Sequence, residues 1–130
     1  MRILRPCDVE NECRLALSGL FNVHCPPLPA NYATPCLLIR ATGGSSTNTV
    51  DTFTVVIDSR GTENDAALEY LRNALGALEA QAQAQVGALR NVALNSLYSW
   101  GTDPVRPDLK LCSATVLVTC HREAHEIESN

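Results

Sequence analysis

The sequence has few aromatic residues and no long apolar run. Aromatic side chains make up 5% of its 130 residues, so a core must be built from Leu, Val, Ala and Ile. Because no stretch of about 18 consecutive apolar residues occurs, we expect no membrane-spanning helix. The apolar content of 45% is that of a globular chain, and the length suits one domain rather than two. Residues 1–130 are therefore predicted to form a single domain.

An excess of basic residues is also missing. The 10 Lys and Arg residues stand against 14 Asp and Glu, which gives a net charge of -4 and a pI near 5.2. Contact with DNA phosphates requires a basic patch, and the Arg residues here are scattered. We therefore expect no specific binding of DNA. Because the first residues turn acidic before an apolar signal-peptide core develops, we expect the protein to be made and used in a cytoplasm.

Paired cysteine motifs are absent, although the sequence has six cysteines, at positions 7, 13, 25, 36, 112 and 120. Without a CxxC pair, a zinc site would have to be assembled by the fold around His24 or His121. A disulfide framework is the other alternative, but it is typical of small secreted chains. We favour buried free thiols, because Cys36, Cys112 and Cys120 lie in apolar, strand-like runs.

Local motifs for catalysis or nucleotide binding are missing too. Neither a GxSxG elbow nor an HExxH helix occurs. Two acidic pairs, Glu10/Glu12 and Glu63/Asp65, lie at expected helix N-termini, where negative charge is stabilising, and this structural role accounts for them. A Gly-Gly-Ser-Ser turn joins two expected strands and lacks the Lys of a phosphate-binding loop. We expect no enzyme activity, no cofactor and no metal site.

The clearest change of period in the sequence lies between Val50 and Ala82. Phe53, Val55 and Ile57 alternate with mostly polar residues, as in a strand with one buried face. Polar residues then offer N-caps and negative charge for the start of a helix. Leucines recur after them at steps of three and four, which predicts an amphipathic helix over residues 63–82 that packs back on the sheet.

An earlier helix is predicted over residues 8–20, with Asp8 as its N-cap. Its apolar stripe consists of Val9, Cys13, Leu17 and Leu20. Residues 21–25 are a candidate edge strand, and three prolines that follow predict a stiff connector.

Two β-hairpins are predicted, over residues 36–58 and 91–122, and residues 123–130 are expected to be a flexible, charged tail. In the second hairpin, alternation predicts a shared face for Val92, Leu94, Tyr98 and Trp100. We therefore expect an α+β fold with a mostly antiparallel sheet of about four to five strands and two helices packed on one face. The Gln/Ala-rich end of the second helix is either a solvated last turn or a surface that meets another subunit.

Several stretches together resemble a known family. They are residues 23–29 (VHCPPLP) after an acid-capped helix, 34–44 (TPCLLIRATGG), 50–58 (VDTFTVVID) and, after an Ala/Leu-rich helix, 100–104 (WGTDP) before a long final strand. In this order they resemble the tail terminator proteins of long-tailed, siphovirus-like bacteriophages. The resemblance spans nearly the whole chain and rests on the order of elements and on turn residues.

The resemblance implies a structural subunit of the virion, located at the tail-neck junction and assembled in the host cytoplasm. Such subunits close into a homo-oligomeric ring, expected to be a hexamer, that caps the tail tube, ends its polymerisation and presents a surface to the head-closure or connector protein. The resemblance also implies a ring through which DNA can pass without specific binding. Two exposed segments are candidate contacts with the tube or the connector, and the alternative is that they are merely exposed turns: Thr47, Asn48 and Thr49 in the first hairpin, and Arg106, Asp108 and Lys110 before the last strand.

Two other functions remain open at this point. One is another component of the phage neck, such as a head-closure or tail-completion protein. The other is a small cytoplasmic enzyme or ligand-binding domain whose site is assembled only by the fold.

Overall fold

A computed structural model describes residues 1–47 and 49–128 of the chain. Along the chain, the elements are β1 (Arg2–Arg5), α1 (Val9–Leu17), β2 (Val23–His24), β3 (Cys36–Ser46), β4 (Val50–Gly61), α2 (Asn64–Gln83), β5 (Leu89–Thr102), β6 (Lys110–His121) and β7 (Glu123–Glu126). The expected α+β fold is confirmed: a mostly antiparallel sheet carries the two helices of the described part.

The main sheet has five strands in the order β2-β3-β4-β6-β5. All of its neighbouring pairs are antiparallel except β2 and β3, which run parallel over two residue pairs. The sheet is therefore bounded by β5 at one edge and by β3 at the other, since β2 covers β3 only at Leu37 and Leu38. The expected hairpins are formed by β3 with β4 and by β5 with β6.

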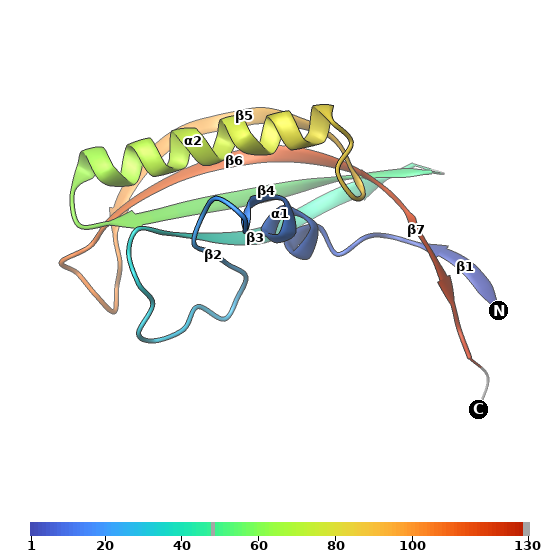
Figure 1. Cartoon of the computed structure of the whole chain (residues 1–130), viewed down its shortest axis with the longest axis horizontal. Coiled ribbons are helices and arrows are strands. Elements are labelled where there is room, and N and C mark those ends of the chain that lie inside the picture. The colour runs from blue at the N-terminus through green and yellow to red at the C-terminus, as the bar shows by residue number, and fades with distance from the viewer. Residues whose placement is uncertain (48, 129–130) are drawn as a thin grey trace.

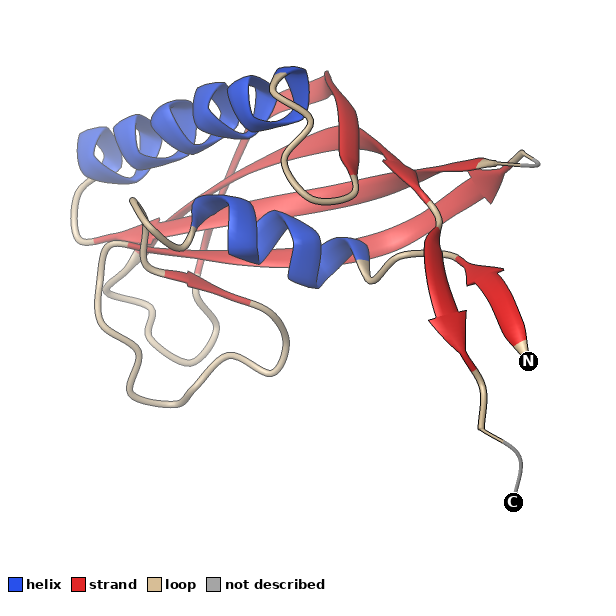
Figure 2. Ribbon diagram, turned by 45° about the vertical axis from the view of Figure 1, so that its right-hand side comes forward, coloured by secondary structure: helices blue, strands red, loops and turns tan. Residues whose placement is uncertain are grey.

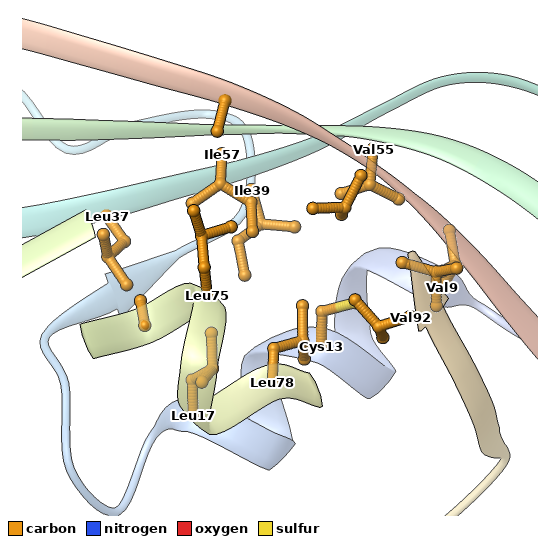
Figure 3. Close-up of a cluster of buried hydrophobic side chains, with 14 of the residues drawn as sticks. Val9, Cys13, Leu17, Leu37, Ile39, Val55, Ile57, Leu75, Leu78 and Val92 are labelled. Carbon is orange, nitrogen blue, oxygen red and sulfur yellow. The ribbon is translucent and has the colours of Figure 1, made fainter. Parts of the chain in front are cut away.

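Both helices pack on the same face of the main sheet (Figures 1 and 2). Val55 and Ile57 of β4 face α2, where Leu71, Leu75 and Leu78 are buried. Figure 3 shows side chains of α1, α2 and the strands meeting in this core. The alternating pattern of β4 and the leucine spacing of α2 thus encode one apolar layer between sheet and helices.

Helix α1 begins where the sequence predicts but ends three residues early. The carboxylate of Asp8 accepts a hydrogen bond from the Asn11 backbone N–H at 3.2 Å, which caps the first turn. The helix ends at Leu17, and Ser18 is its C-cap. The predicted extent of 8–20 is therefore wrong at its end, and Leu20, expected on the buried stripe, is 76% exposed.

The turn between β4 and α2 is tightly packed. A Cβ added at Gly61 would lie 3.1 Å from the Ala67 nitrogen, and the Ser59 hydroxyl donates to the Ala67 carbonyl at 2.8 Å. Glu63 is the N-cap residue but its side chain makes no cap hydrogen bond. The close approach between strand and helix, rather than a side-chain cap, therefore fixes the start of α2.

The first four residues of the segment 123–130, predicted to be a flexible tail, form a strand instead. Glu123–Glu126 form β7, which pairs antiparallel with β1 in a separate two-stranded sheet. Arg5 Nε lies 2.5 Å from Glu123 Oε1 across this pair. The ribbon projects from the body of the molecule near both chain ends (Figure 1).

The first hairpin is longer than predicted. Gly43 to Ser46, expected to form the turn, continue β3 and pair with β4 beyond an irregularity between Ala41 and Gly43. Strand β3 ends at Ser46 and β4 begins at Val50, and Asn48 between them is outside the described residues. Within the described part, neither helix is long and apolar enough to cross a membrane.

Candidate assembly surfaces

The candidate contact residues lie at two opposite ends of the sheet. The pairing of β4 with β6 runs from Val50 opposite His121 to Gly61 opposite Lys110. The hairpin turn that contains Thr47 and Thr49 is therefore at one end. Arg106, Asp108 and Lys110 are at the other, roughly 36 Å away for a strand of this length. The fold thus separates the two predicted groups instead of joining them into one site.

Arg122 holds the base of the hairpin turn. Its guanidinium pairs with the buried carboxylate of Asp51 at 3.2 Å and donates to the Ser46 hydroxyl and to the Thr47 carbonyl. Ser46 in turn donates to Asp51 at 2.5 Å. The hydrogen bond from Ser46 lowers the pKa of Asp51, and Arg122 adds to this effect against the opposing effect of burial. The turn is thereby fixed to the end of β6.

Asp103 holds the loop at the opposite end. One carboxylate oxygen accepts hydrogen bonds from the Tyr32 hydroxyl at 2.5 Å and from Arg60 Nε at 2.8 Å. The other oxygen accepts from the backbone N–H groups of Val105 and Arg106 at 2.8 and 3.0 Å. Tyr32, Arg60 and Asp103 are all buried. This cluster ties the Pro-rich connector, the end of β4 and the loop after β5 into one unit.

The ionisation of the cluster follows from its contacts. Burial by itself raises the pKa of Asp103, but the hydrogen bonds from Tyr32, Arg60 and the loop backbone outweigh it and hold that pKa well below the usual range. Burial and the hydrogen bond to Asp103 raise the pKa of Tyr32 to about 12. At neutral pH the cluster therefore contains one buried carboxylate, one guanidinium and a neutral phenol.

The three predicted contact residues of this loop differ in their surroundings. Arg106 is half-buried: it donates to the Tyr32 carbonyl at 2.9 Å, and its guanidinium carbon lies 4.8 Å from the centre of the Tyr32 ring. Asp108 is exposed, and Lys110 is partly exposed at the start of β6. Arg106 therefore helps to shape the loop, whereas Asp108 is available on its surface.

The second half of β5 carries exposed apolar side chains. Val92, Leu94 and Trp100 share one face as predicted, because they pair with the buried Val118, Val116 and Cys112 of β6. Val92 is buried, whereas Leu94, Tyr98 and Trp100 are 42%, 37% and 47% exposed, and Leu97 is 48% exposed. The pairing with β6 shifts register between Leu94 and Ser96 and again between Ser96 and Ser99. These irregularities interrupt the alternation between Leu94 and Ser99, so Ser96 pairs with Thr115 on the other face, but Leu94 and Trp100 stay on the same face.

The backbone at the centre of this exposed segment is strained. Tyr98 has φ 53°, a left-handed conformation that costs a residue with a Cβ about 1–2 kcal/mol. A non-glycine residue held there is unusual, and such strain concentrates at functional positions. We name Leu94, Leu97, Tyr98 and Trp100 the β5 apolar edge.

A groove of about 350 Å³ lies beside the other edge of the sheet. It is bounded by the end of β3, the neighbouring part of β4 and the segment after β1. Its lining residues are Pro6, Ala41, Gly43, Gly44, Ser45, Ser46, Asp51 and Phe53. A Cβ at Gly44 would lie 2.6 Å from the Thr52 carbonyl oxygen, so bare backbone forms part of the floor. We name this hollow the β3 groove.

No arrangement in the described residues suggests metal chemistry. No group of three or more His, Cys, Asp or Glu side chains there is placed to hold a metal ion. The cysteines are free thiols, all buried except the half-buried Cys25. Burial raises the pKa of Cys13 to about 12, as is typical of unreactive thiols in apolar surroundings.

Comparison with known proteins yields no assignment. No protein-family model and no curated protein sequence matches the chain. Any function must therefore be argued from four features: the end of the sheet held by Arg122 and Asp51, the end held by Arg60 and Asp103, the β5 apolar edge and the β3 groove.

Proposed function

We propose that the chain is the subunit of a phage tail terminator: a ring, expected to be a hexamer, that caps the tail tube, ends its polymerisation and joins the tail to the head connector. The α+β fold agrees with the resemblance of the sequence to that family. The observation that carries the proposal is the placement of two fixed loops at opposite ends of one sheet. A protein that joins two different assemblies along one axis needs such a pair of ends.

Described residues at both ends are held by ion pairs. Arg122 with Asp51 fixes one loop, and Arg60 with Asp103 fixes the other, each through an ion pair with a buried carboxylate. A loop that is already ordered loses little conformational entropy when it binds, which increases affinity. Both ends therefore suit repeated contacts of defined geometry, in which every copy of the ring must bind its neighbour in the same way.

Single charged substitutions at the two ends test the proposal. Thr49 and Asp108 are exposed, so Thr49→Lys and Asp108→Lys should leave the fold intact. The assays use tail tube protein and DNA-filled heads encoded by the same genome, with tube length measured by electron microscopy and head joining by infectivity. The wild-type chain stops tube growth and supports joining. One variant should lose tube capping by about tenfold or more while the other loses head joining.

Two results would contradict the proposal. Tubes that grow to the same length with and without the wild-type chain would remove the terminator function. Loss of the same step in both variants would show that the two ends do not have separate partners. A chain that binds heads and never tubes would instead be a head-closure or tail-completion protein.

A further inference from the structure

One segment of each edge strand of the main sheet lacks charged residues, although β3 carries Arg40, β5 carries Arg90 and both strands have register shifts. The sequence from Leu94 to Thr102 on β5 (LNSLYSWGT) has no charged residue, and neither has the end of β3 from Ala41 to Ser46 (ATGGSS). Unpaired strand edges bind other strands, so monomeric proteins place Lys, Pro or short strands there. Uncharged edge segments of this kind are candidate surfaces for pairing with a strand of another chain.

The β5 apolar edge is large enough to be an interaction site. Its four side chains are between 37% and 48% exposed. Since a large side chain offers about 150–250 Å², the exposed apolar area is on the order of 300 Å², the size at which a patch on a monomer is often functional.

Two residues of the β5 apolar edge, Leu94 and Trp100, are on the same face of the sheet as the β3 groove. Leu94 and Trp100 pair with Val116 and Cys112 of β6, whose side chains face the helices. The groove is bounded on that face by Phe53 and Asp51. These residues are two and four positions from the core residue Val55 along β4, so they point to the same face as Val55. If the sheet of one copy continued into the next, Leu94 and Trp100 would therefore lie over the groove of the neighbour.

We propose that the ring of the preceding section is closed by one repeated contact, in which the β5 apolar edge of one copy docks in the β3 groove of the next. This inference rests on the proposed function and names its subunit interface. The two surfaces are different parts of the chain on opposite edges, which is the arrangement that head-to-tail rings require. The mainly apolar groove fits apolar side chains, and neither edge segment brings a charge of its own into the contact.

The pairing of the strands also sets the displacement between neighbours. The segment from Leu94 to Trp100 is centred opposite Ala114 of β6, and the groove strands are centred near Val118. Neighbouring copies are therefore shifted along the strands by about four residues, roughly 13 Å. Such a stagger is what strands tilted in a closed ring produce.

The experiment uses one variant for each side of the contact. Trp100→Lys places a charge on the exposed β5 apolar edge, and Ala41→Arg places a long side chain across the β3 groove, where Ala41 is exposed. Native mass spectrometry of the wild type at increasing concentration should show a closed oligomer. Each variant alone should be monomeric, with the dissociation constant raised about 30-fold or more. Trp100→Phe should retain assembly, and far-UV circular dichroism checks that every variant is folded.

A mixture of the two variants makes the test specific. Each retains one intact surface, so equal amounts should form a 1:1 dimer and nothing larger. Val105→Lys, a control at an 80% exposed apolar residue outside both edges, should assemble like the wild type. A wild-type monomer, assembly of either folded variant, or a mixture that stays monomeric would overturn the interface. A failure of the proposed function would give another result: the wild-type ring would form through this contact, but tail tubes would keep growing in its presence.

Discussion

At the scale of single residues, the ends of the molecule depend on two buried carboxylates. Asp103 meets Arg60 and Tyr32, which are 43 and 71 residues away in the sequence. Asp51 meets Arg122, 71 residues away. Side-chain pairs at such separations leave no periodic pattern in the sequence. The sequence therefore predicts only that Asp103 is part of a turn. Its contacts with Tyr32 and Arg60 follow from the folded structure alone.

Removing the charge of Asp103 should destabilise the protein. Asp103→Asn leaves the Arg60 guanidinium, which is 7% exposed, without a counter-charge, and breaking a buried pair in this way costs about 3–5 kcal/mol. The free energy of unfolding in urea measures the effect. Asp108→Asn, in the same loop but exposed, is the matched control and should change stability by less than about 0.5 kcal/mol. Equal effects of the two variants would contradict the assignment.

The same carboxylate predicts a pH dependence of stability. The folded-state pKa of Asp103 lies below its usual value, which is about 3.9 in an unfolded chain. Its stabilising contribution is therefore complete above that value and is lost as the pH falls through the lower, folded-state pKa. The difference in unfolding free energy between the wild type and Asp103→Asn should shrink below about pH 4. A difference that stays constant from neutral to acid pH would show that ionisation of Asp103 is not its source.

At the scale of elements, alternation in strands and the spacing of apolar residues in helices predict which face of an element is buried. Strand β4, strand β6 and helix α2 all bury the faces that their patterns indicate. On β5 the pattern placed Val92, Leu94 and Trp100 on one face correctly, but it could not show that Leu94 and Trp100 remain exposed or that the register shifts between Leu94 and Ser99. The patterns also did not predict β1 and β7. Each of these strands has four residues, and they pair although they lie near opposite ends of the sequence. Neither a bulge nor a long-range pairing of short strands has a local signal.

The two faces of β4 should differ in their tolerance of charge. Val55 is fully buried between the sheet and α2, while the adjacent Thr54 is half-buried on the face away from the helices. Val55→Lys buries an unpaired ammonium and should cost more than about 4 kcal/mol, enough to unfold much of the protein. Thr54→Lys should cost about 1 kcal/mol. Urea unfolding followed by circular dichroism compares them, and similar losses would mean that the face away from the helices is also part of the core.

At the scale of the whole molecule, one side of the sheet is free of helices in the part of the chain that the structure describes. Its half-buried side chains include Thr52, Thr54, Thr115 and Thr119. The one arginine of β3, Arg40, pairs with Asp58 at 3.2 Å. On this face the threonines are mixed with the half-buried apolar residues Val56 and Leu117. Because Arg40 is paired, the face offers little free positive charge to DNA phosphates.

Duplex DNA should therefore bind the assembled protein weakly or not at all. The net charge of each chain is -4, so a ring of any size is acidic, and Arg60 and Arg122 are already paired with carboxylates. Fluorescence anisotropy with a labelled duplex should give a dissociation constant weaker than about 10⁻⁴ M at physiological salt, the weak limit of non-specific binding. Asp58→Asn frees Arg40 and removes one acidic charge per chain, so it should tighten binding relative to the wild type. Tight, salt-dependent binding by the wild type would instead place a basic DNA-contacting surface on the assembly, which neither the composition nor the paired arginines predict.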